Sequence, residues 1–231
     1  MSGPAEHSGP REACGVFGIY APGRNVAPIV FDGLTALQHR GQESAGMAVS
    51  DGSTMLVMKD MGLVAQVFND YKIASLVGHL AIGHTRYSTA GSSSWHNAQP
   101  MYRQAGGMEF AVGHNGNLTN VEELAASMGM LPGMATSDSD LMAELLARRL
   151  DIAAPAAPDG AASLVGALVE VLPLLQGAFS LVLSSRSQLI GARDPNGFRP
   201  LCLGKLDDGW VLASETPALD ISGAHFVREV E

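Results

Sequence analysis

A cysteine at the start of an apolar segment is the first candidate for chemistry in this sequence. Thirteen mostly small or polar residues precede Cys14, and the apolar run that follows it predicts a strand over 14–21. If the peptide bond between Ala13 and Cys14 is cut, Cys14 carries both a thiol nucleophile and an α-amine. That amine has a pKa of about 7.7–8.0, so it could serve as the general base without a partner histidine. The alternative is that Cys14 is a small buried apolar side chain, as most free cysteines are.

The pair Asn115-Gly116 is the candidate for stabilising an oxyanion. It follows a predicted strand over 109–112 and offers a carboxamide N–H beside a backbone N–H, which suits the tetrahedral oxyanion of acyl transfer. The alternative is a type I′ hairpin turn, for which Asn-Gly is a strong signal. His114 and Asn117 weaken that alternative, because a plain turn does not need four consecutive polar residues.

Three charged residues could bind or brace a small zwitterion. Arg86 ends a predicted strand over 79–86 and could grip a carboxylate, although a surface ion pair would also explain it. Asp138 lies at a predicted helix start and could hold an ammonium group or simply cap the helix. Arg40 could brace the site or end the preceding helix. Together with Cys14, these residues specify an amino acid that has a side-chain amide.

The periodicity of apolar residues predicts the elements that must position these groups. We expect further strands over 44–50, 54–59, 177–184, 188–193, 201–204, 210–214 and 226–231. We expect helices over 26–39, 62–76, 141–150, 162–175 and 215–221, and one more that is capped by Thr119 or Asn120. The polar stretch 87–100 is typical of a functional loop. Strands at both ends with helices between them predict two sheets covered by helices in one α+β domain.

Composition excludes several classes of protein. The 231 residues carry a net charge of −9, which argues against nucleic acid or an anionic membrane surface as the main partner. There is no apolar run long enough for a membrane span, and the first thirteen residues lack the apolar core of a secretory signal. Only Cys14 and Cys202 could form a disulfide, so a reducing cytoplasm is the simpler expectation. No cysteine and histidine cluster has metal-ligand spacing, so we expect no metal site.

Seven short motifs appear in a characteristic order. They begin at Cys14 (CGVFG), Gln38 (QHRGQESAG), Gly83 (GHTRYSTAG), Asn97 (NAQP), Gly113 (GHNGN), Thr136 (TSDSD) and Arg193 (RDPNGFRP). In these motifs the chain closely resembles the class II glutamine amidotransferase domain of the glutamine phosphoribosylpyrophosphate amidotransferases. The sequence from Gln38 separates it from the glucosamine-6-phosphate synthase branch of the same amidotransferases.

The resemblance implies an N-terminal nucleophile (Ntn) hydrolase fold, a four-layer αββα sandwich of two antiparallel sheets. It implies a propeptide over 1–13 and a glutaminase domain over 14–231. The family's chain is about twice as long and continues into a phosphoribosyltransferase domain, whose acidic motif does not occur here. We therefore expect this chain to be the glutaminase half of a longer protein.

The resemblance also implies roles for individual residues. Cys14 would be the nucleophile, and Asn115 and Gly116 would form the oxyanion hole. Arg86 would bind the α-carboxylate of glutamine and Asp138 its α-ammonium.

Further residues of the matching motifs are expected close to the same substrate. Thr85 and His84 are expected among the glutamine-binding residues. Arg40, Tyr87 and Ser88 are expected to support the site and its loop, which would run over about 86–95 and close over the substrate.

The implied reaction is hydrolysis of glutamine to glutamate and ammonia through a thioester on Cys14. The ammonia would serve 5-phosphoribosylamine formation in purine biosynthesis. No cofactor is expected in this domain, because the Mg²⁺ of the family and the iron–sulfur cluster of some members would lie outside this stretch. The full-length protein would be a cytoplasmic homo-oligomer. The alternative is an uncleaved, catalytically silent precursor or a regulatory binding domain with the same fold.

Overall fold

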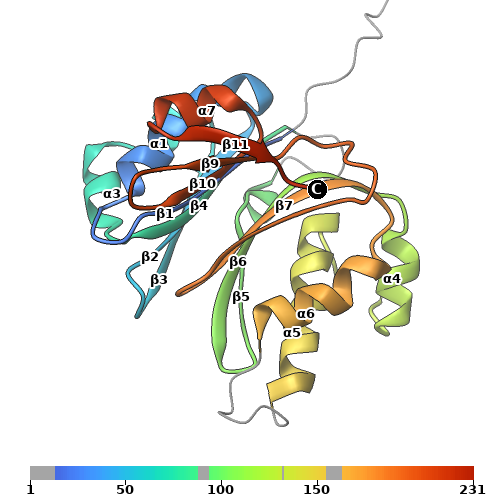
Figure 1. Ribbon diagram of the computed structural model, residues 1–231. Coiled ribbons are helices and arrows are strands. Elements are labelled where there is room, and N and C mark those ends of the chain that lie inside the picture. Colours follow the sequence, from blue (N-terminus) through green and yellow to red (C-terminus); the bar gives the residue numbers. More distant parts are fainter. Residues whose placement is uncertain (1–13, 88–93, 132, 155–162) are drawn as a thin grey trace, which may run out of the picture.

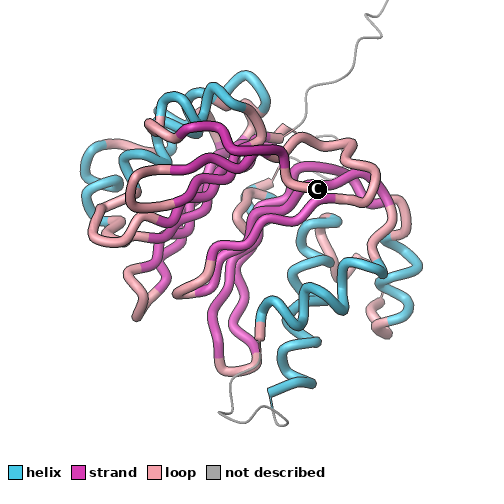
Figure 2. The backbone as a smooth tube through the Cα atoms, in the orientation of Figure 1, coloured by secondary structure: helices cyan, strands magenta, loops and turns pink. Residues whose placement is uncertain are grey.

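Two antiparallel β-sheets lie face to face, with helices on the outer face of each. The computed structural model describes residues 14–87, 94–131, 133–154 and 163–231. Figures 1 and 2 show α1, α3 and α7 outside one sheet and α4, α5 and α6 outside the other, which gives four layers in the order αββα. This arrangement confirms the α+β sandwich that the sequence predicts.

The larger sheet has seven strands and contains the strand that follows Cys14. Its order is β11 (His225–Glu229), β9 (Cys202–Lys205), β10 (Trp210–Ala213), β1 (Gly15–Tyr20), β4 (Leu80–Arg86), β2 (Ser44–Ser50) and β3 (Met55–Met61). The helices α1 (Ala27–Ala36), α2 (Val64–Val67), α3 (Asp70–Ser75) and α7 (Thr216–Ile221) accompany this sheet. Because β1 is central and pairs with β4 and β10, the segment that begins at Cys14 is held on both sides.

The smaller sheet has four strands and contains the Asn-Gly pair. Its order is β5 (Met101–Ala105), β6 (Met108–Leu118), β7 (Gly177–Ser185) and β8 (Leu189–Arg193). Its outer face packs on α4 (Val121–Ser127), α5 (Asp138–Ala153) and α6 (Leu164–Val171). Three short 3-10 helices complete the described elements: η1 (Gln38–Arg40), η2 (Trp95–Asn97) and η4 (Leu172–Leu174).

Alternation along β1 shows how the layers are built. Val16 joins the apolar cluster between the two sheets, whereas Phe17 and Ile19 join the cluster under the outer helices. Gly18 faces the second sheet so closely that a Cβ atom would lie 2.5 Å from Val182 Cγ1. A strand buried on both faces must be apolar at successive positions, which explains the continuous apolar run after Cys14.

The structure differs from the sequence prediction at several helices and strands. The single helix predicted over 62–76 is two short helices, α2 and α3. They are separated because Phe68 is extended and the Asn69 side chain caps α3. The strand β5 was not predicted at all. The helix predicted over 162–175 ends at Val171 and continues only as the turn η4.

The cap predicted for the helix after Thr119 is right in position but not in bonding. Asn120 occupies the N-cap position of α4, but its side chain makes no capping hydrogen bond and instead accepts one from the Gln176 backbone N–H over 3.1 Å.

The most consequential difference concerns β6. The predicted strand 109–112 extends to Leu118, so Asn115 and Gly116 lie inside it, opposite Ser180 and Phe179 of β7. The hairpin-turn interpretation of Asn115-Gly116 is therefore wrong. In the part of the chain that the structure describes, no helix is long and apolar enough to cross a bilayer.

Candidate active site

A small polar pocket brings the sequence-predicted residues together where the two sheets and the start of α5 meet. Its lining includes Cys14 before β1, Arg86 at the end of β4, Gly116 within β6 and Asp138 at the start of α5. Tyr87, which was expected to support the site, lines the same pocket. The free space is about 20 Å³, enough for roughly one water molecule. Any amino-acid substrate would therefore have to displace the surrounding side chains.

Cys14 is partly buried and lines this pocket. Its Sγ atom lies 3.4 Å from the Tyr87 backbone nitrogen and 3.5 Å from the Tyr87 carbonyl oxygen. Burial raises the pKa of the thiol, while the Tyr87 hydrogen bond and the Arg86 charge act in the opposite direction. A thiol with a raised pKa is protonated at neutral pH, so it needs a base before it can attack.

Arg40 braces Cys14 from the side of η1. Its Nε atom donates to the Cys14 carbonyl oxygen over 3.1 Å, and its Nη1 atom pairs with Glu215. His39 contacts the other oxygen of the same carboxylate, with 2.9 Å between His39 Nε2 and Glu215 Oε2. Both interpretations offered for Arg40 fit the structure, because Arg40 ends η1 and also donates to Cys14. Sequence reasoning missed Glu215, because nothing in the sequence shows that it lies beside η1.

Arg86 is oriented by a buried carboxylate. It pairs with Glu43, and the side chains of the two residues are only 6% and 14% exposed. The backbone adds a second link, because the Glu43 N–H donates to the Arg86 carbonyl oxygen over 3.0 Å. The surface ion pair considered for Arg86 is therefore wrong. The guanidinium enters the pocket from a fixed position.

Asp138 is held at the first turn of α5 without being the cap. Its Oδ1 atom accepts from the Ser139 backbone N–H over 2.8 Å, and its Oδ2 atom from the Leu118 N–H over 3.2 Å. Ser137 fills the N-cap position, so the capping interpretation of Asp138 is wrong. His114 Nδ1 lies 3.7 Å from Asp138 Oδ1. Burial lowers the pKa of His114, which opposes the attraction of the carboxylate.

Asn115 presents unused side-chain polar groups on β6, and Gly116 packs closely against β7. Asn115 is fully buried, and neither side-chain amide atom has a hydrogen-bond partner among the described residues. Such orphaned atoms are rare in folded proteins and call for an explanation. At Gly116 a Cβ atom would lie 2.1 Å from the Ala178 carbonyl oxygen, so only glycine fits against β7. Asn115 does not itself line the pocket.

Thr85 and His84 lie behind the pocket. Thr85 is opposite Gly15 on β1, and its hydroxyl donates to the Leu37 carbonyl oxygen over 3.4 Å. His84 Nε2 lies 2.9 Å from the His114 carbonyl oxygen, and burial lowers the pKa of His84 to about 3. Neither residue lines the pocket, so direct contact with a substrate stays a prediction. Ser88, like most of the loop predicted over 86–95, is outside the described residues.

The structure also adds residues to which the sequence analysis assigned no role. Gln99, His114 and Ser139 line the pocket, and all three are buried. Their signal in the sequence was their position in the NAQP, GHNGN and TSDSD motifs, but type and spacing alone do not show that they touch one another. Among the described residues, no three side chains of metal-binding type gather at one place.

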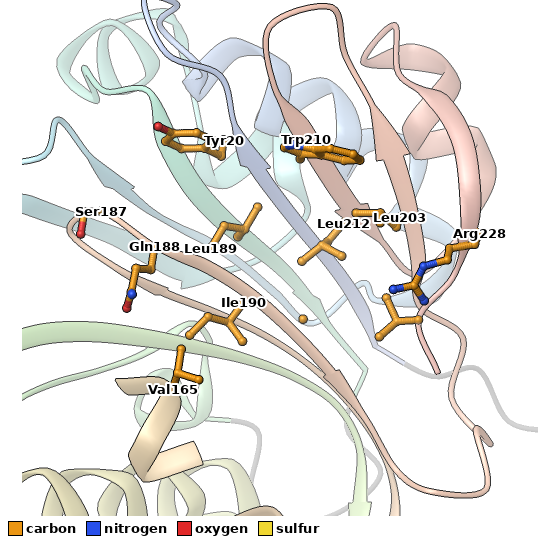
Figure 3. A pocket seen from close by; sticks show the side chains of 12 residues that line it. Tyr20, Val165, Ser187, Gln188, Leu189, Ile190, Leu203, Trp210, Leu212 and Arg228 are labelled. Carbon is orange, nitrogen blue, oxygen red and sulfur yellow. The ribbon is translucent and has the colours of Figure 1, made fainter. Parts of the chain in front are cut away.

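A larger cavity lies on the open side of the two sheets. It measures about 530 Å³, and Figure 3 shows Leu189 and Ile190 of β8 facing Trp210 and Leu212 of β10, with Arg228 at one end. By size, this cavity would be a stronger candidate for the site than the small pocket. Its lining holds no thiol or carboxylate, however, so the chemistry favours the small pocket that contains Cys14.

Comparison with known proteins agrees with this geometry. The chain matches the model of the glutamine amidotransferase domain over residues 84–221. It is 52% identical to the amidophosphoribosyltransferase of Mycobacterium leprae over 236 residues, which cover 98% of this chain and 40% of the relative. The corresponding enzyme of Bacillus subtilis is 38% identical, over 98% of this chain and 46% of the relative.

Solved structures extend the comparison to the fold. Glutamine phosphoribosylpyrophosphate amidotransferase from B. subtilis superposes with a TM-score of 0.81 at 36% identity, over 94% of this chain and 45% of that one. A structure described as the allosteric regulatory enzyme of purine biosynthesis gives a TM-score of 0.82 at 37% identity, with the same coverage. The chain thus spans less than half the length of these relatives. It belongs to the glutamine amidotransferase domain family.

Proposed function

We propose that this chain is a glutaminase that hydrolyses L-glutamine to L-glutamate and ammonia, with Cys14 as the nucleophile. The observation that carries the proposal is the single pocket lined by Cys14, Arg86, Gly116 and Asp138. These residues come from four separate segments of the chain. A thiol, a cation, a backbone amide and a carboxylate together match the amide, the α-carboxylate and the α-ammonium of glutamine.

The reaction begins after the bond between Ala13 and Cys14 is cut. The freed α-amine takes the thiol proton, and Sγ attacks the δ-carbonyl carbon of glutamine to form a tetrahedral oxyanion. The Asn115 carboxamide and the Gly116 backbone N–H donate to this oxyanion. The C–N bond then breaks, and the amine proton passes to the departing ammonia. Water cleaves the resulting γ-glutamyl thioester, which yields glutamate and restores the thiol.

Two charged side chains select the substrate. Arg86 binds the α-carboxylate, and its pairing with Glu43 keeps the guanidinium oriented before substrate arrives. Asp138 binds the α-ammonium at the start of α5. Since the pocket has room for only about one water molecule, the side chains around it move outward when glutamine binds.

In the full-length protein, the ammonia would aminate phosphoribosyl pyrophosphate. The relatives that match this chain are named amidophosphoribosyltransferase and are more than twice as long as the matched segment. We assign the glycosyl transfer step of purine biosynthesis, any Mg²⁺ or iron–sulfur cluster, and homo-oligomer formation to that longer protein in the cytoplasm. The described domain by itself would supply ammonia.

The decisive experiment compares two cysteine variants. Cys14→Ala should abolish the release of glutamate from glutamine, measured by a coupled glutamate assay. Cys202→Ala is the matched control, because Cys202 lies on β9 and does not line the pocket. Wild-type turnover in Cys14→Ala would disprove the proposed mechanism.

An inactive precursor is the second candidate. Thirteen residues precede Cys14 in this chain, and a peptide nitrogen cannot act as the base. Intact-mass measurement separates the two forms: a mass that begins at Cys14 supports the active enzyme, and a mass that begins at Met1 supports the precursor. We also expect weak glutaminase activity that does not depend on the acceptor. A strong response to added phosphoribosyl pyrophosphate would contradict that expectation.

A further inference from the structure

The side chain of Gln99 takes the place of a strand residue beside β6. The last pair of β5 and β6 is Met101 opposite Val112, and two more steps in this register place residue 99 opposite His114. There the Gln99 carboxamide forms the two hydrogen bonds with the His114 backbone that the peptide groups of a longer β5 would form. Its Oε1 atom accepts from the His114 N–H over 2.7 Å, and its Nε2 atom donates to the His114 carbonyl oxygen over 3.4 Å.

The same carboxamide reaches the start of α5. Gln99 Nε2 donates to Ser139 Oγ over 3.0 Å. Ser139 Oγ lies 2.9 Å from His114 Nδ1 and 3.3 Å from Asp138 Oδ1. Because Gln99, His114 and Ser139 are all buried, these bonds are shielded from bulk solvent. The Gln99 amide thus links β6, the strand that contains Asn115 and Gly116, to Ser139, the residue next to Asp138.

Contacts with the larger sheet hold the backbone around Gln99 in place. Gly46 of β2 lies so close that a Cβ atom there would be 2.2 Å from the Gln99 carbonyl oxygen. Lys59 of β3 donates from Nζ to the carbonyl oxygens of Ala98 and Pro100. The residues on both sides of Gln99 are therefore fixed against the larger sheet, and the Gln99 side chain bridges from that sheet to α5.

We propose that Gln99 is a positioning residue that fixes the Asp138 carboxylate through Ser139 and His114 and so makes the site select substrates that carry an α-ammonium. This inference rests on the proposed glutaminase function. Without the Gln99 amide, the Ser139 hydroxyl keeps His114 Nδ1 as its polar neighbour but loses the Gln99 donor that fixes its direction. Its 3.3 Å bond to Asp138 Oδ1 is then no longer fixed, and the carboxylate is held only by the backbone N–H groups of Ser139 and Leu118. A carboxylate with fewer fixed partners is less well oriented and binds an ammonium less well.

The test uses two substrates that differ only at the α-carbon. Glutaramate has the chain, the amide and the carboxylate of glutamine but has hydrogen where glutamine has its ammonium group. The preference is the ratio of kcat/KM for L-glutamine to kcat/KM for glutaramate. Gln99→Met should lower this preference by roughly tenfold or more, as expected for a weakened hydrogen bond to a charged group. The loss should fall mainly on KM for glutamine.

Gln104→Met is the matched control, because Gln104 lies on the neighbouring β5 and is exposed. It should keep the wild-type preference. A Gln99→Met variant that loses activity on both substrates in the same proportion would overturn the inference, because general damage to the site does not distinguish them.

Ser139→Ala gives a second route if Gln99→Met fails to fold. It removes the hydroxyl link but keeps both bonds between Gln99 and His114, and it should lower the preference in the same way. A wild-type protein whose mass begins at Cys14 and that has no glutaminase activity would refute the proposed function and this inference with it. An active wild type whose preference survives in Ser139→Ala would refute the inference alone.

Discussion

Arg40 Nε donates a hydrogen bond to the backbone carbonyl oxygen of Cys14 over 3.1 Å, and this bond ties η1 to the residue just before β1, the strand at the centre of the larger sheet. The thiol of Cys14 is thereby held by its own backbone as well as by its contacts with Tyr87. Arg40 does not line the pocket, so it acts on the nucleophile and not on the substrate.

We therefore expect Arg40→Met to lower kcat for glutamine by roughly tenfold or more, because small displacements of a nucleophile are costly. KM should change little. Steady-state kinetics of glutamate release would measure both values. Arg24→Met is the control, since Arg24 forms an exposed ion pair with Asp208. A rise in KM at constant kcat would show that Arg40 acts on substrate binding instead.

Arg86→Lys tests the proposed binding of the glutamine α-carboxylate by Arg86. Lysine keeps the charge but cannot donate two parallel hydrogen bonds to a carboxylate. We expect KM for glutamine to rise by roughly 10- to 100-fold, in line with about 1.5–3 kcal/mol for a hydrogen bond to a charged group. Arg148→Lys should be neutral, because Arg148 pairs with Glu144 on the accessible face of α5. An unchanged KM in Arg86→Lys would remove Arg86 from the proposed binding site.

Gly116→Ala should damage both the site and the fold. The added Cβ atom would lie 2.1 Å from the Ala178 carbonyl oxygen and 2.7 Å from Phe179 Cα, so β6 and β7 would have to separate. We expect a loss of about 1–3 kcal/mol in the free energy of unfolding, together with loss of glutaminase activity. Urea denaturation followed by circular dichroism would measure the first effect.

Gly166→Ala is the opposite case. Gly166 lies in α6, where a Cβ atom would make only ordinary contact, 3.5 Å from Ser163 Cβ. Alanine is the better helix former, so this variant should gain about 0.5–1 kcal/mol. Equal effects of the two substitutions would contradict the steric argument for Gly116.

The buried His84 makes stability depend on acid pH. Burial lowers its pKa from 6.5 to about 3, so between these values the unfolded chain binds a proton that the folded chain does not. The free energy of unfolding must therefore fall as the pH decreases from about 6.5 towards 3. His84→Gln removes the group that binds this proton. Between about pH 7 and pH 4.5, the free energy of unfolding of this variant should therefore fall by up to about 2 kcal/mol less than that of wild type.

Urea midpoints at the two pH values would measure that difference. His225→Gln is the control, because His225 is exposed on β11. Some acid sensitivity should remain in His84→Gln, since burial also lowers the pKa of His114. If His84→Gln and wild type lose the same stability, His84 is not the group that titrates.

Much of the fold could be predicted because the period of apolar residues follows the burial of each element. The strands of the C-terminal third were found to within a residue or two, since short apolar runs there alternate with clear turns. The segment 62–76 was predicted as one helix because its apolar residues fit a helical stripe. It forms two helices because Asn69 caps a new helix and so ends the first. The strand β5 was missed because its run Met101–Ala105 includes Arg103 and Gln104, which hide the strand pattern.

The site could be predicted only in part. Residue type drew attention to Cys14, Arg86, Gly116 and Asp138, which the structure brings to one pocket, and to Asn115, which does not line it. The sequence alone could not decide between the functional and the purely structural interpretation of each of these residues. Whether Asn115-Gly116 is a turn depends on whether β7 pairs alongside it, and β7 lies about sixty residues later in the chain.

The sequence by itself therefore determined which chemical groups this protein has and the order in which its elements occur, because both follow from side-chain type and local periodicity. Only the tertiary structure decided how these groups are held. Glu43 orients Arg86, Glu215 holds Arg40, and Gln99 links His114 to Ser139. The physical reason is that hydrogen bonds and ion pairs depend on distances of about 3 Å. Such distances between residues far apart in the chain arise only when the two sheets pack.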